Sequence, residues 1–228
     1  MSVSSFPILK IRSLHKDYDL PGGIVRALQL SFLDAAKGEA IAITGPSGSG
    51  KTTLLHLLAA LKRPSGGSIE FEGKSITSLN ASAAANWRAK NVGYVFQDVN
   101  LLPDFDVLEN LLIAAEISTV PGKLAIERAY ALLDCLNIKE RKHHRPEKLS
   151  LGERQRAAIA RALIHRPPII LADEPTASLD AQNTEIVINL LLDLSKESIL
   201  IVTTHDEAVK KRFTRFVELR KLEEIQCA

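Results

Sequence analysis

The sequence predicts an α/β fold: a mostly parallel sheet with an antiparallel β subdomain at the N-terminus and an inserted helical subdomain. The first observation is a set of short, mainly apolar segments at residues 40–44, 92–96, 168–173 and 199–204. Such segments are typical of strands that are covered on both faces. The second observation is that helical patterns alternate with these strands, which indicates a parallel sheet. The third is that this alternation stops between residues 98 and 158.

The N-terminal part of the chain has a different pattern. Residues 8–18 and 24–33 alternate apolar and polar side chains, and Pro21-Gly22-Gly23 separates the two segments. Alternation with a period of two around a Pro-Gly turn predicts an antiparallel hairpin. We expect a further strand at residues 68–71.

Helical periodicity divides the chain further. Three consecutive helices, with no convincing strand between them, are predicted inside the interrupted region at residues 107–117, 122–136 and 152–164. We therefore predict one domain with a core of residues 1–97 and 159–228 and a helical subdomain at 98–158. The remaining segments belong to the core: helices at 51–61, 81–90, 183–195 and 206–213, and candidate strands at 216–219 and 222–225 that would close the sheet.

Composition and charge exclude several classes of protein. The 228 residues carry 29 basic and 27 acidic side chains, and the net charge of +2 gives no general field that would attract nucleic acid. Cys135 and Cys227 do not suggest a disulfide framework. No apolar run approaches the ~18 residues of a spanning helix, and the N-terminus lacks a signal-peptide pattern. We therefore expect a cytoplasmic protein that reaches a membrane only through another chain.

A glycine-rich segment joins the strand at 40–44 to the helix that follows. It fits the pattern G-x-x-x-x-G-K-[ST], in which backbone N–H groups surround phosphate oxygens and the lysine neutralises the terminal phosphates. The positive end of the helix dipole faces the same place, and the Thr52 hydroxyl is a ligand for Mg²⁺. The motif predicts a P-loop NTPase core of the RecA-like type, whose nucleotide contacts come from Gly45, Pro46, Ser47, Gly48, Ser49, Gly50, Lys51, Thr52 and Thr53.

Polar side chains follow the other apolar strands, at the edge of a parallel sheet where ligands collect. Asp173 and Glu174 end one strand, and a period of two sends them to opposite sides. We assign Asp173 to Mg²⁺ and Glu174 to polarising the attacking water. His205 follows the next strand and is placed to contact the terminal phosphate, the alternative being a cap for the next helix. Gln97 follows the strand at 92–96 and reaches the metal or the water.

The segment Ser150-Leu151-Gly152-Glu153 fits a capping box, with Ser150 as the N-cap and Glu153 reaching back to it. A helix start of this kind exposes amide donors and is either a second anion site or an ordinary helix N-terminus. Local chemistry does not decide between these two interpretations.

The order of these motifs resembles that of the ATP-binding subunits of ABC transporters over the whole chain. The matching elements are the glycine loop, Gln97, the signature segment at 149–153, the strand through Glu174, Ser178-Leu179-Asp180 and His205. The resemblance implies that ATP and Mg²⁺ are bound and that ATP is hydrolysed to ADP and phosphate.

The same resemblance implies how the subunits assemble. Tyr18 is expected to stack on the adenine ring, and two such domains are expected to pair head to tail. Ser150 and Gly152 of one domain then lie near the γ-phosphate that the other domain holds. The expected partners are a membrane permease, contacted by the helical subdomain after Gln97, and a second copy or a homologous ATPase, with no nucleic acid. This places the chain on the inner face of the cytoplasmic membrane.

Within the family, the chain is most similar to the small ATPases of lipoprotein-releasing and macrolide-exporter systems. The similarity is carried by the glycine loop and by Val95-Phe96-Gln97, Leu101-Leu102-Pro103 and Val107-Leu108-Glu109-Asn110. The alternatives are an ATPase subunit of an amino-acid importer and a soluble ABC ATPase without a transport role.

Two positions depart from the family pattern. Leu151 replaces the first of two glycines usual in the signature segment. We expect it to be tolerated because Ser150 and Gly152 are kept. The alternative is that Leu151 crowds the dimer face and leaves a slow enzyme that uses ATP mainly to dimerise. The final turn at 219–222 also lacks its usual glycine.

Overall fold

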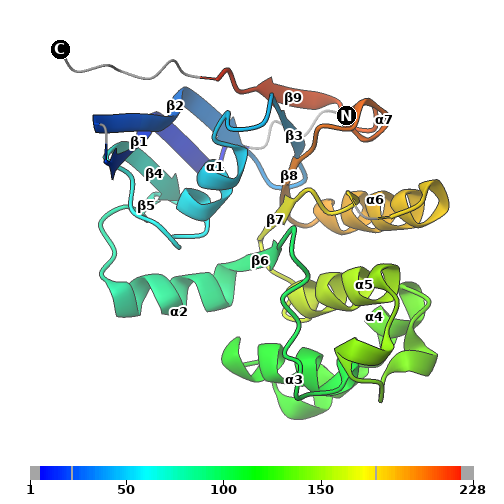
Figure 1. Cartoon of the computed structure of the whole chain (residues 1–228). Coiled ribbons are helices and arrows are strands. Elements are labelled where there is room, and N and C mark those ends of the chain that lie inside the picture. Colours follow the sequence, from blue (N-terminus) through cyan, green and yellow to red (C-terminus); the bar gives the residue numbers. More distant parts are fainter. Residues whose placement is uncertain (1–5, 22, 178, 222–228) are drawn as a thin grey trace.

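The computed structural model describes residues 6–21, 23–177 and 179–221, and it contains two sheets with helix α1 (Lys51–Leu58) between them (Figure 1). The larger sheet has the strand order β6-β7-β8-β3-β9, and every neighbouring pair in it is parallel. Its strands are β3 (Ala40–Thr44), β6 (Val92–Val95), β7 (Ile169–Asp173), β8 (Ile199–Thr203) and β9 (Arg215–Glu218). The predicted parallel core is confirmed, while the candidate strand at 222–225 lies outside the described residues.

The central strands are apolar throughout because both of their faces are covered. In β7, Ile169 and Leu171 belong to a buried cluster shared with α1 and the smaller sheet, whereas Ile170 and Ala172 belong to a cluster shared with helices on the other face. Successive side chains of a strand point to opposite faces, so a strand covered twice needs apolar residues at every position. Full burial of a large aliphatic side chain contributes about 1.5–3 kcal/mol.

The smaller sheet is antiparallel and has the order β2-β1-β4-β5. Its strands are β1 (Leu9–Leu20), β2 (Gly23–Ala35), β4 (Gly66–Phe71) and β5 (Lys74–Ser75). The pairing of Leu9 with Ala35 and of Leu20 with Gly23 confirms the predicted hairpin. Strand β5 was not predicted, because two exposed polar residues carry no apolar pattern.

The helices occupy the predicted places, with two corrections. They are α2 (Ala81–Asn91), α3 (Val107–Ile117), α4 (Gly122–Cys135), α5 (Leu151–Leu163), α6 (Ala181–Ser195) and α7 (Glu207–Lys210), with short 3₁₀ turns η1 (Lys139–Arg141) and η2 (Pro146–Lys148). Helix α1 was predicted to reach residue 61 but ends at Leu58, because the chain turns at Ala60 with φ 51°. Helix α7 was predicted to span 206–213 but covers a single turn.

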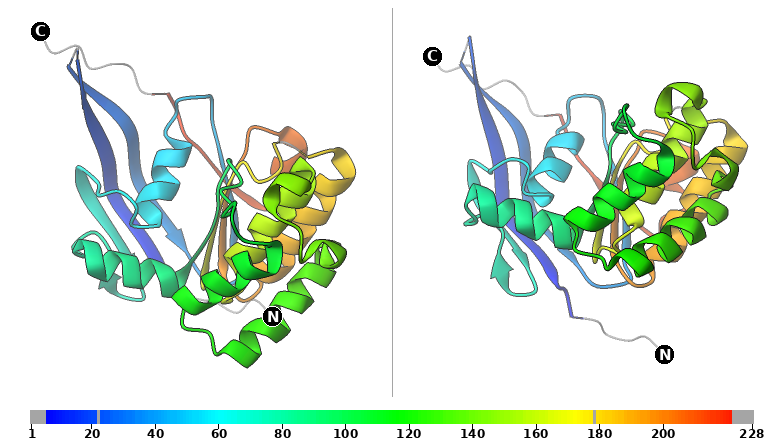
Figure 2. Two further views of the ribbon diagram at one scale, coloured as in Figure 1. Left: turned by 60° about the horizontal axis from the view of Figure 1, so that its bottom comes forward. Right: turned by 90° about the horizontal axis from the view of Figure 1, so that it is seen from below.

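Between β6 and β7 the chain forms only helices and turns, and α3, α4 and α5 lie together on one side of the parallel sheet (Figure 2). Their apolar side chains do not form a separate core: Leu111, Ala129 and Ile159 share one buried cluster with Ile170 and Val202 of the sheet. The helical part is therefore anchored on the sheet through α5. The subdomain boundaries at 98 and 158 stay a prediction.

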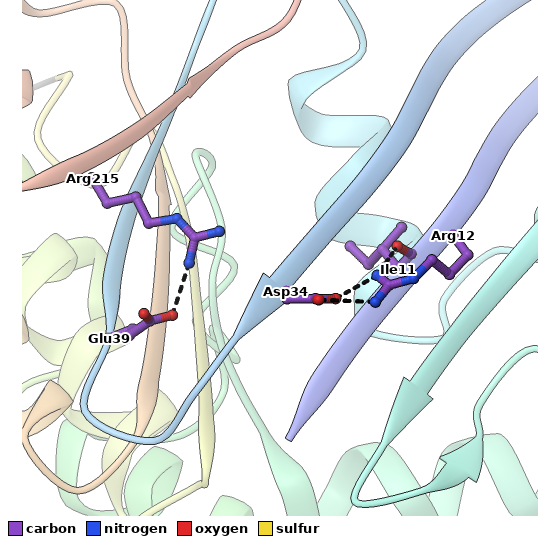
Figure 3. A network of polar contacts seen from close by, with 5 residues as sticks. All are labelled: Ile11, Arg12, Asp34, Glu39 and Arg215. Atoms are coloured by element: carbon purple, nitrogen blue, oxygen red, sulfur yellow. Dashed lines mark hydrogen bonds and ion pairs between the residues drawn. The ribbon is translucent and has the colours of Figure 1, made fainter. Parts of the chain in front are cut away.

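Two ion pairs tie neighbouring strands together (Figure 3). Arg12 of β1 donates to the carboxylate of Asp34 in β2, with 2.8 Å between Nη2 and Oδ2, and also to the carbonyl of Ile11. Arg215 of β9 donates to Glu39, just before β3, at 2.9 Å. The hydrogen bond from Arg12 lowers the pKa of Asp34 below its usual range. These side chains are partly exposed, so the pairs add little to stability compared with the buried clusters.

Within the described residues, no helix is both long and apolar enough to cross a bilayer.

Asn110 of α3 is fully buried and organises the loop that precedes the helix. Its Oδ1 accepts from the N–H of Leu102, and its Nδ2 donates to the carbonyls of Leu102, Phe105 and Asp106. We expect Asn110→Ala to lower the free energy of unfolding by about 2–4 kcal/mol, because buried backbone groups lose their partners. Denaturant unfolding measures this loss. Asn189→Ala, which removes one exposed acceptor from α6, is the control and should change little; equal losses in the two variants would contradict the role of Asn110.

Candidate nucleotide-binding site

Four connections meet at the carboxyl edge of the parallel sheet. The glycine loop follows β3, Gln97 lies just after β6, Glu174 follows β7, and His205 lies just after β8. Parallel strands deliver their C-terminal ends to one edge, which is where open α/β sheets bind ligands. The sheet therefore gathers residues that are more than a hundred positions apart in the sequence.

The glycine loop is wedged between the two sheets, and this is why glycine is needed at its ends. Gly45 has φ 142°, and a Cβ there would lie 2.3 Å from the carbonyl oxygen of Leu219. Gly50 has φ 91°, and a Cβ there would lie 2.3 Å from the carbonyl oxygen of Ala27 in β2. Both positions combine a left-handed backbone with a close approach of another backbone, which only glycine allows.

Lys51 begins α1 and bends back over the loop. Its Nζ donates to the carbonyl oxygens of Gly45, at 2.8 Å, and Pro46, at 3.2 Å. These contacts hold a positive charge at the mouth of the loop, beside the positive end of the α1 dipole. The arrangement suits an anion with several oxygens.

Thr203 bonds to both Asp173 and Glu174, to the side chain of the first and the backbone of the second. Asp173 is buried, and its Oδ1 accepts from the Thr203 hydroxyl at 2.6 Å. The strand ends there, and Glu174 has a left-handed backbone with φ 46°. The N–H of Glu174 donates to Thr203, at 3.2 Å to its carbonyl and 3.0 Å to its hydroxyl oxygen. The predicted alternation to opposite sides therefore does not apply, because the strand ends before Glu174, and both residues line one cavity.

His205 contacts Glu174 directly. Its Nδ1 lies 2.9 Å from Oε1 of Glu174, which is within the distance of an ion pair. The side chain of Glu174 is 11% exposed, whereas that of His205 is 71% exposed. The alternative that His205 caps the next helix is wrong, because Asp206 is the N-cap of α7 and accepts from Ala208.

One cavity of about 690 Å³ collects most of the predicted site. This volume lies within the usual range for small-molecule sites, about 300–1,000 Å³. The lining residues are Ala27, Gly45, Pro46, Ser47, Gly48, Gly50, Lys51, Thr52, Thr53, Gln97, Asp173, Glu174 and His205. The structure thus brings together the glycine loop, both carboxylates, the glutamine and the histidine.

Four predicted residues do not line this cavity. Ser49 is buried inside the glycine loop. Tyr18 lies on β1 opposite Val25, and the ammonium groups of Lys16 and Lys62 lie 5.2 and 4.9 Å from its ring centroid. Ser150 and Gly152 stand at the start of α5, in the helical part of the chain. Tyr18 and the signature residues therefore remain predictions that depend on further contacts.

The predicted capping box at the start of α5 is confirmed. Ser150 accepts from the N–H of Glu153 at 3.2 Å, and Glu153 accepts from the N–H of Ser150 at 2.8 Å. Arg141 donates to the other carboxylate oxygen of Glu153 at 2.8 Å and, with Ser150, lowers the pKa of Glu153 to about 2. Leu151 is 44% exposed at the first helical position.

Three residues of the site were missed by sequence reasoning. Thr203 supports both carboxylate residues, Ala27 closes the cavity from the smaller sheet, and Gln155 donates to the carbonyl beside Glu174. A threonine at the end of an apolar strand next to the Asp-Glu strand was the one local signal for Thr203. Ala27 and Gln155 carry no local signal because their roles arise from packing between distant segments.

A glycine loop that opens a helix, beside a carboxylate pair at the edge of a parallel sheet, defines a P-loop nucleotide-binding domain. The family model described as ABC transporter matches residues 28–177. The chain belongs to the ABC transporter family, as an ABC-type ATPase, and the predicted family is confirmed.

The curated relatives indicate the subgroup. The lipoprotein-releasing system ATP-binding protein LolD of Oleidesulfovibrio alaskensis is 40% identical over 93% of this chain and 93% of its own length. The LolD protein of Bacteroides fragilis is 42% identical over 86% of this chain and 92% of its own length. These relatives confirm the predicted similarity to the lipoprotein-releasing group.

A solved structure supports the fold. The ATP-binding cassette MJ0796, in a dimeric post-hydrolysis state bound to ADP and Pi, matches with a TM-score of 0.88 and 33% identity. The match covers 95% of this chain and 96% of that one. The P-loop fold with its antiparallel β part is thereby confirmed.

Gly50→Ala tests the packing of the glycine loop. We expect weaker ATP binding by at least ~10-fold and a lower melting temperature, because the added Cβ meets the Ala27 carbonyl and the loop must shift. Equilibrium binding of ATP and thermal unfolding measure the two effects. Gly73→Ala is the matched control: Gly73 also has a positive φ, but nothing lies within 4 Å of its Cβ position. Equal ATP affinity in the two variants would show that the close approach is unimportant.

Proposed function

We propose that two copies of this chain clasp two Mg-ATP molecules and, by hydrolysing them, drive a membrane permease of the lipoprotein-releasing type from the inner face of the cytoplasmic membrane. The observation that carries the proposal is the single cavity in which Lys51, Glu174 and His205 meet the glycine loop. The full-length similarity to LolD proteins supports the choice of transport system.

In this proposal the phosphates of ATP lie along the glycine loop. The loop N–H groups and the start of α1 donate to phosphate oxygens, and Lys51 exchanges its contacts with the Gly45 and Pro46 carbonyls for the terminal phosphates. Such fixed donors stabilise negative charge without reorganisation during the reaction.

The residues around the cavity fit a magnesium ion. Thr52, Gln97 and Asp173 offer hydroxyl, amide and carboxylate oxygens to the same space, and these are the donors that Mg²⁺ prefers. Asp173 uses Oδ1 to accept from Thr203, which fixes its carboxylate and leaves Oδ2 for the ion or its water. A bound Mg²⁺ would neutralise phosphate charge during transfer.

Glu174 is placed to act on the attacking water. Its carboxylate is mostly shielded from solvent, and its backbone is fixed by Thr203. The carboxylate accepts a hydrogen bond from the water and so orients the oxygen toward the terminal phosphate. The His205 ring is exposed and can turn from Glu174 to the phosphate.

A second copy would complete the site. The start of α5 carries Ser150 and Gly152 outside the cavity, with a preformed capping box. A helix N-terminus of this kind suits the γ-phosphate of a nucleotide held by another subunit. The dimeric state of MJ0796 supports the pairing of two copies. In the proposed head-to-tail arrangement, Tyr18 would stack on the adenine ring within one subunit.

A groove on the helical part suits the permease. It has a volume of about 430 Å³ and lies between α2, β6, α3 and α5. Two of its apolar lining residues are exposed, Leu102 by 38% and Ile117 by 65%. Arg88 and Arg161 also line the groove and give it positive charge. Exposed apolar surface with a polar rim is typical of protein-protein contacts. Phe96 lines this groove, and the next residue, Gln97, lines the nucleotide cavity. A segment docked in the groove would therefore lie close to the nucleotide.

Glu174→Gln tests the assignment of the base. We expect ATP binding to persist, turnover to fall by about 10²–10⁴-fold, and an ATP-bound dimer to accumulate, because the amide does not accept a proton. Turnover, ATP affinity and dimer mass are measured on the purified chain with magnesium and permease. Glu207→Gln, an exposed change two residues after His205, serves as the control and should hydrolyse ATP normally. Normal turnover by Glu174→Gln would refute the assignment.

Ile117→Glu tests the docking groove. A charge on this apolar wall should weaken permease association by at least ~10-fold while the isolated chain binds ATP normally, because a hydrated carboxylate replaces apolar surface that the permease would cover. Co-purification from membranes gives the readout. Ile126→Glu alters an exposed isoleucine of α4 that does not line the groove and should retain association. If both variants lost permease association, or if neither did, the assignment of this groove as the docking site would be wrong.

A further inference from the structure

The second turn of helix α5 is hydrogen-bonded to the loop that carries Glu174. Gln155 is 3% exposed, and its Nε2 donates to the carbonyl oxygen of Pro175 at 3.0 Å. Pro175 directly follows Glu174, so this bond lies one peptide away from the residue assigned as the base.

The loop after β7 is held from two sides. On the sheet side, Thr203 accepts the N–H of Glu174. On the helix side, Gln155 binds the next carbonyl. Glu174 keeps a left-handed backbone with φ 46°, a conformation that a non-glycine residue adopts only when its surroundings impose it. Loss of either hydrogen bond would therefore allow the backbone of Glu174 to leave its left-handed conformation.

The neighbouring residue makes a second contact from the same turn. Arg156 donates to Oδ1 of Asn183, and Asn183 donates to the carboxylate of Asp180 at 2.7 Å. Asp180 is the N-cap of α6. Helix α5 is thus bonded both just after Glu174 and at the start of the following helix.

We propose that Gln155 is a positioning residue for Glu174 and links the start of α5 to the base within one chain. An α-helix is stiff over the roughly one and a half turns that separate Ser150 from Gln155. A shift of the signature end is therefore passed to the Pro175 carbonyl and the carboxylate beside it. This inference rests on the proposed function, in which Ser150 contacts the nucleotide of the other copy and Glu174 acts on its own. It gives each subunit a direct path from the partner's nucleotide to its own hydrolysis step.

The test is Gln155→Leu in the full chain with its permease. Leucine fills a similar volume but has no donor for the Pro175 carbonyl. We expect kcat to fall at least ~10-fold with ATP affinity and KM nearly unchanged, because misplacement of a reacting group affects the chemical step. Circular dichroism sets a temperature at which every variant is folded. Gln155→Met, which keeps the length of the side chain, replaces the leucine variant if that one does not fold.

Ser198→Ala is a matched control for the loss of a buried bond. Ser198 is 6% exposed, and its hydroxyl donates to the carbonyl of Pro167 at 2.6 Å. Both residues lie just before the N-terminal ends of β8 and β7, at the edge of the sheet opposite the candidate site. A stability effect alone would lower turnover in both variants, whereas positioning lowers kcat only for Gln155→Leu. A parental kcat for Gln155→Leu, or an equal loss in Ser198→Ala, would overturn the inference.

The double variant separates positioning from an independent effect. If Gln155 acts through Glu174, then Gln155→Leu adds no further loss of single-turnover rate in the Glu174→Gln background. Additive losses would overturn the inference. Failure of the proposed function gives a different result. The parental chain would then not hydrolyse ATP, or Glu174→Gln would hydrolyse ATP at the parental rate with either residue at position 155.

Discussion

The parallel pairing of β7 with β8 is the constraint on which the site depends. It sets Thr203 opposite Asp173, so that one buried hydroxyl bonds the Asp173 carboxylate and the Glu174 backbone together. Strand β3 lies on the other side of β8 and delivers the glycine loop to the same edge. Strand pairing thereby sets the spacing between the glycine loop and the carboxylate residues, because backbone hydrogen bonds hold neighbouring strands about 4.8 Å apart.

The glycine loop depends on the junction between the two sheets. Gly45 touches the backbone after β9 and Gly50 touches that of β2, so the loop is shaped by both sheets at once. Helix α1, which the loop opens, is buried between them through Leu54, Leu55 and Leu57. The shape of the loop is accordingly a property of the assembled core, although the residues proposed to contact phosphate are consecutive.

Much of the fold and of the candidate site could be predicted from the sequence. Doubly covered strands must be apolar throughout, and a loop with left-handed backbone needs glycine, so the parallel strands, the glycine loop and the capping box of α5 all have local signatures. The order of the motifs likewise predicted the family, the residues of a few segments predicted similarity to the lipoprotein-releasing group, and both predictions are confirmed. Helix ends were less predictable, because α1 stops where the chain turns at Ala60 and α7 stops after one turn.

The sequence by itself determined the elements, the chemistry of the glycine loop and the positions of Asp173, Glu174 and His205 at strand ends. Only the tertiary structure decided what surrounds them: Thr203 bonded to both carboxylate residues, the His205 ring nitrogen close to the Glu174 carboxylate, and Gln155 bonded to the Pro175 carbonyl. It also left Tyr18 and the start of α5 outside the main cavity. The physical reason is that periodicity and backbone conformation are set by neighbours in sequence, whereas these contacts join residues that only the packing of sheet and helices brings together.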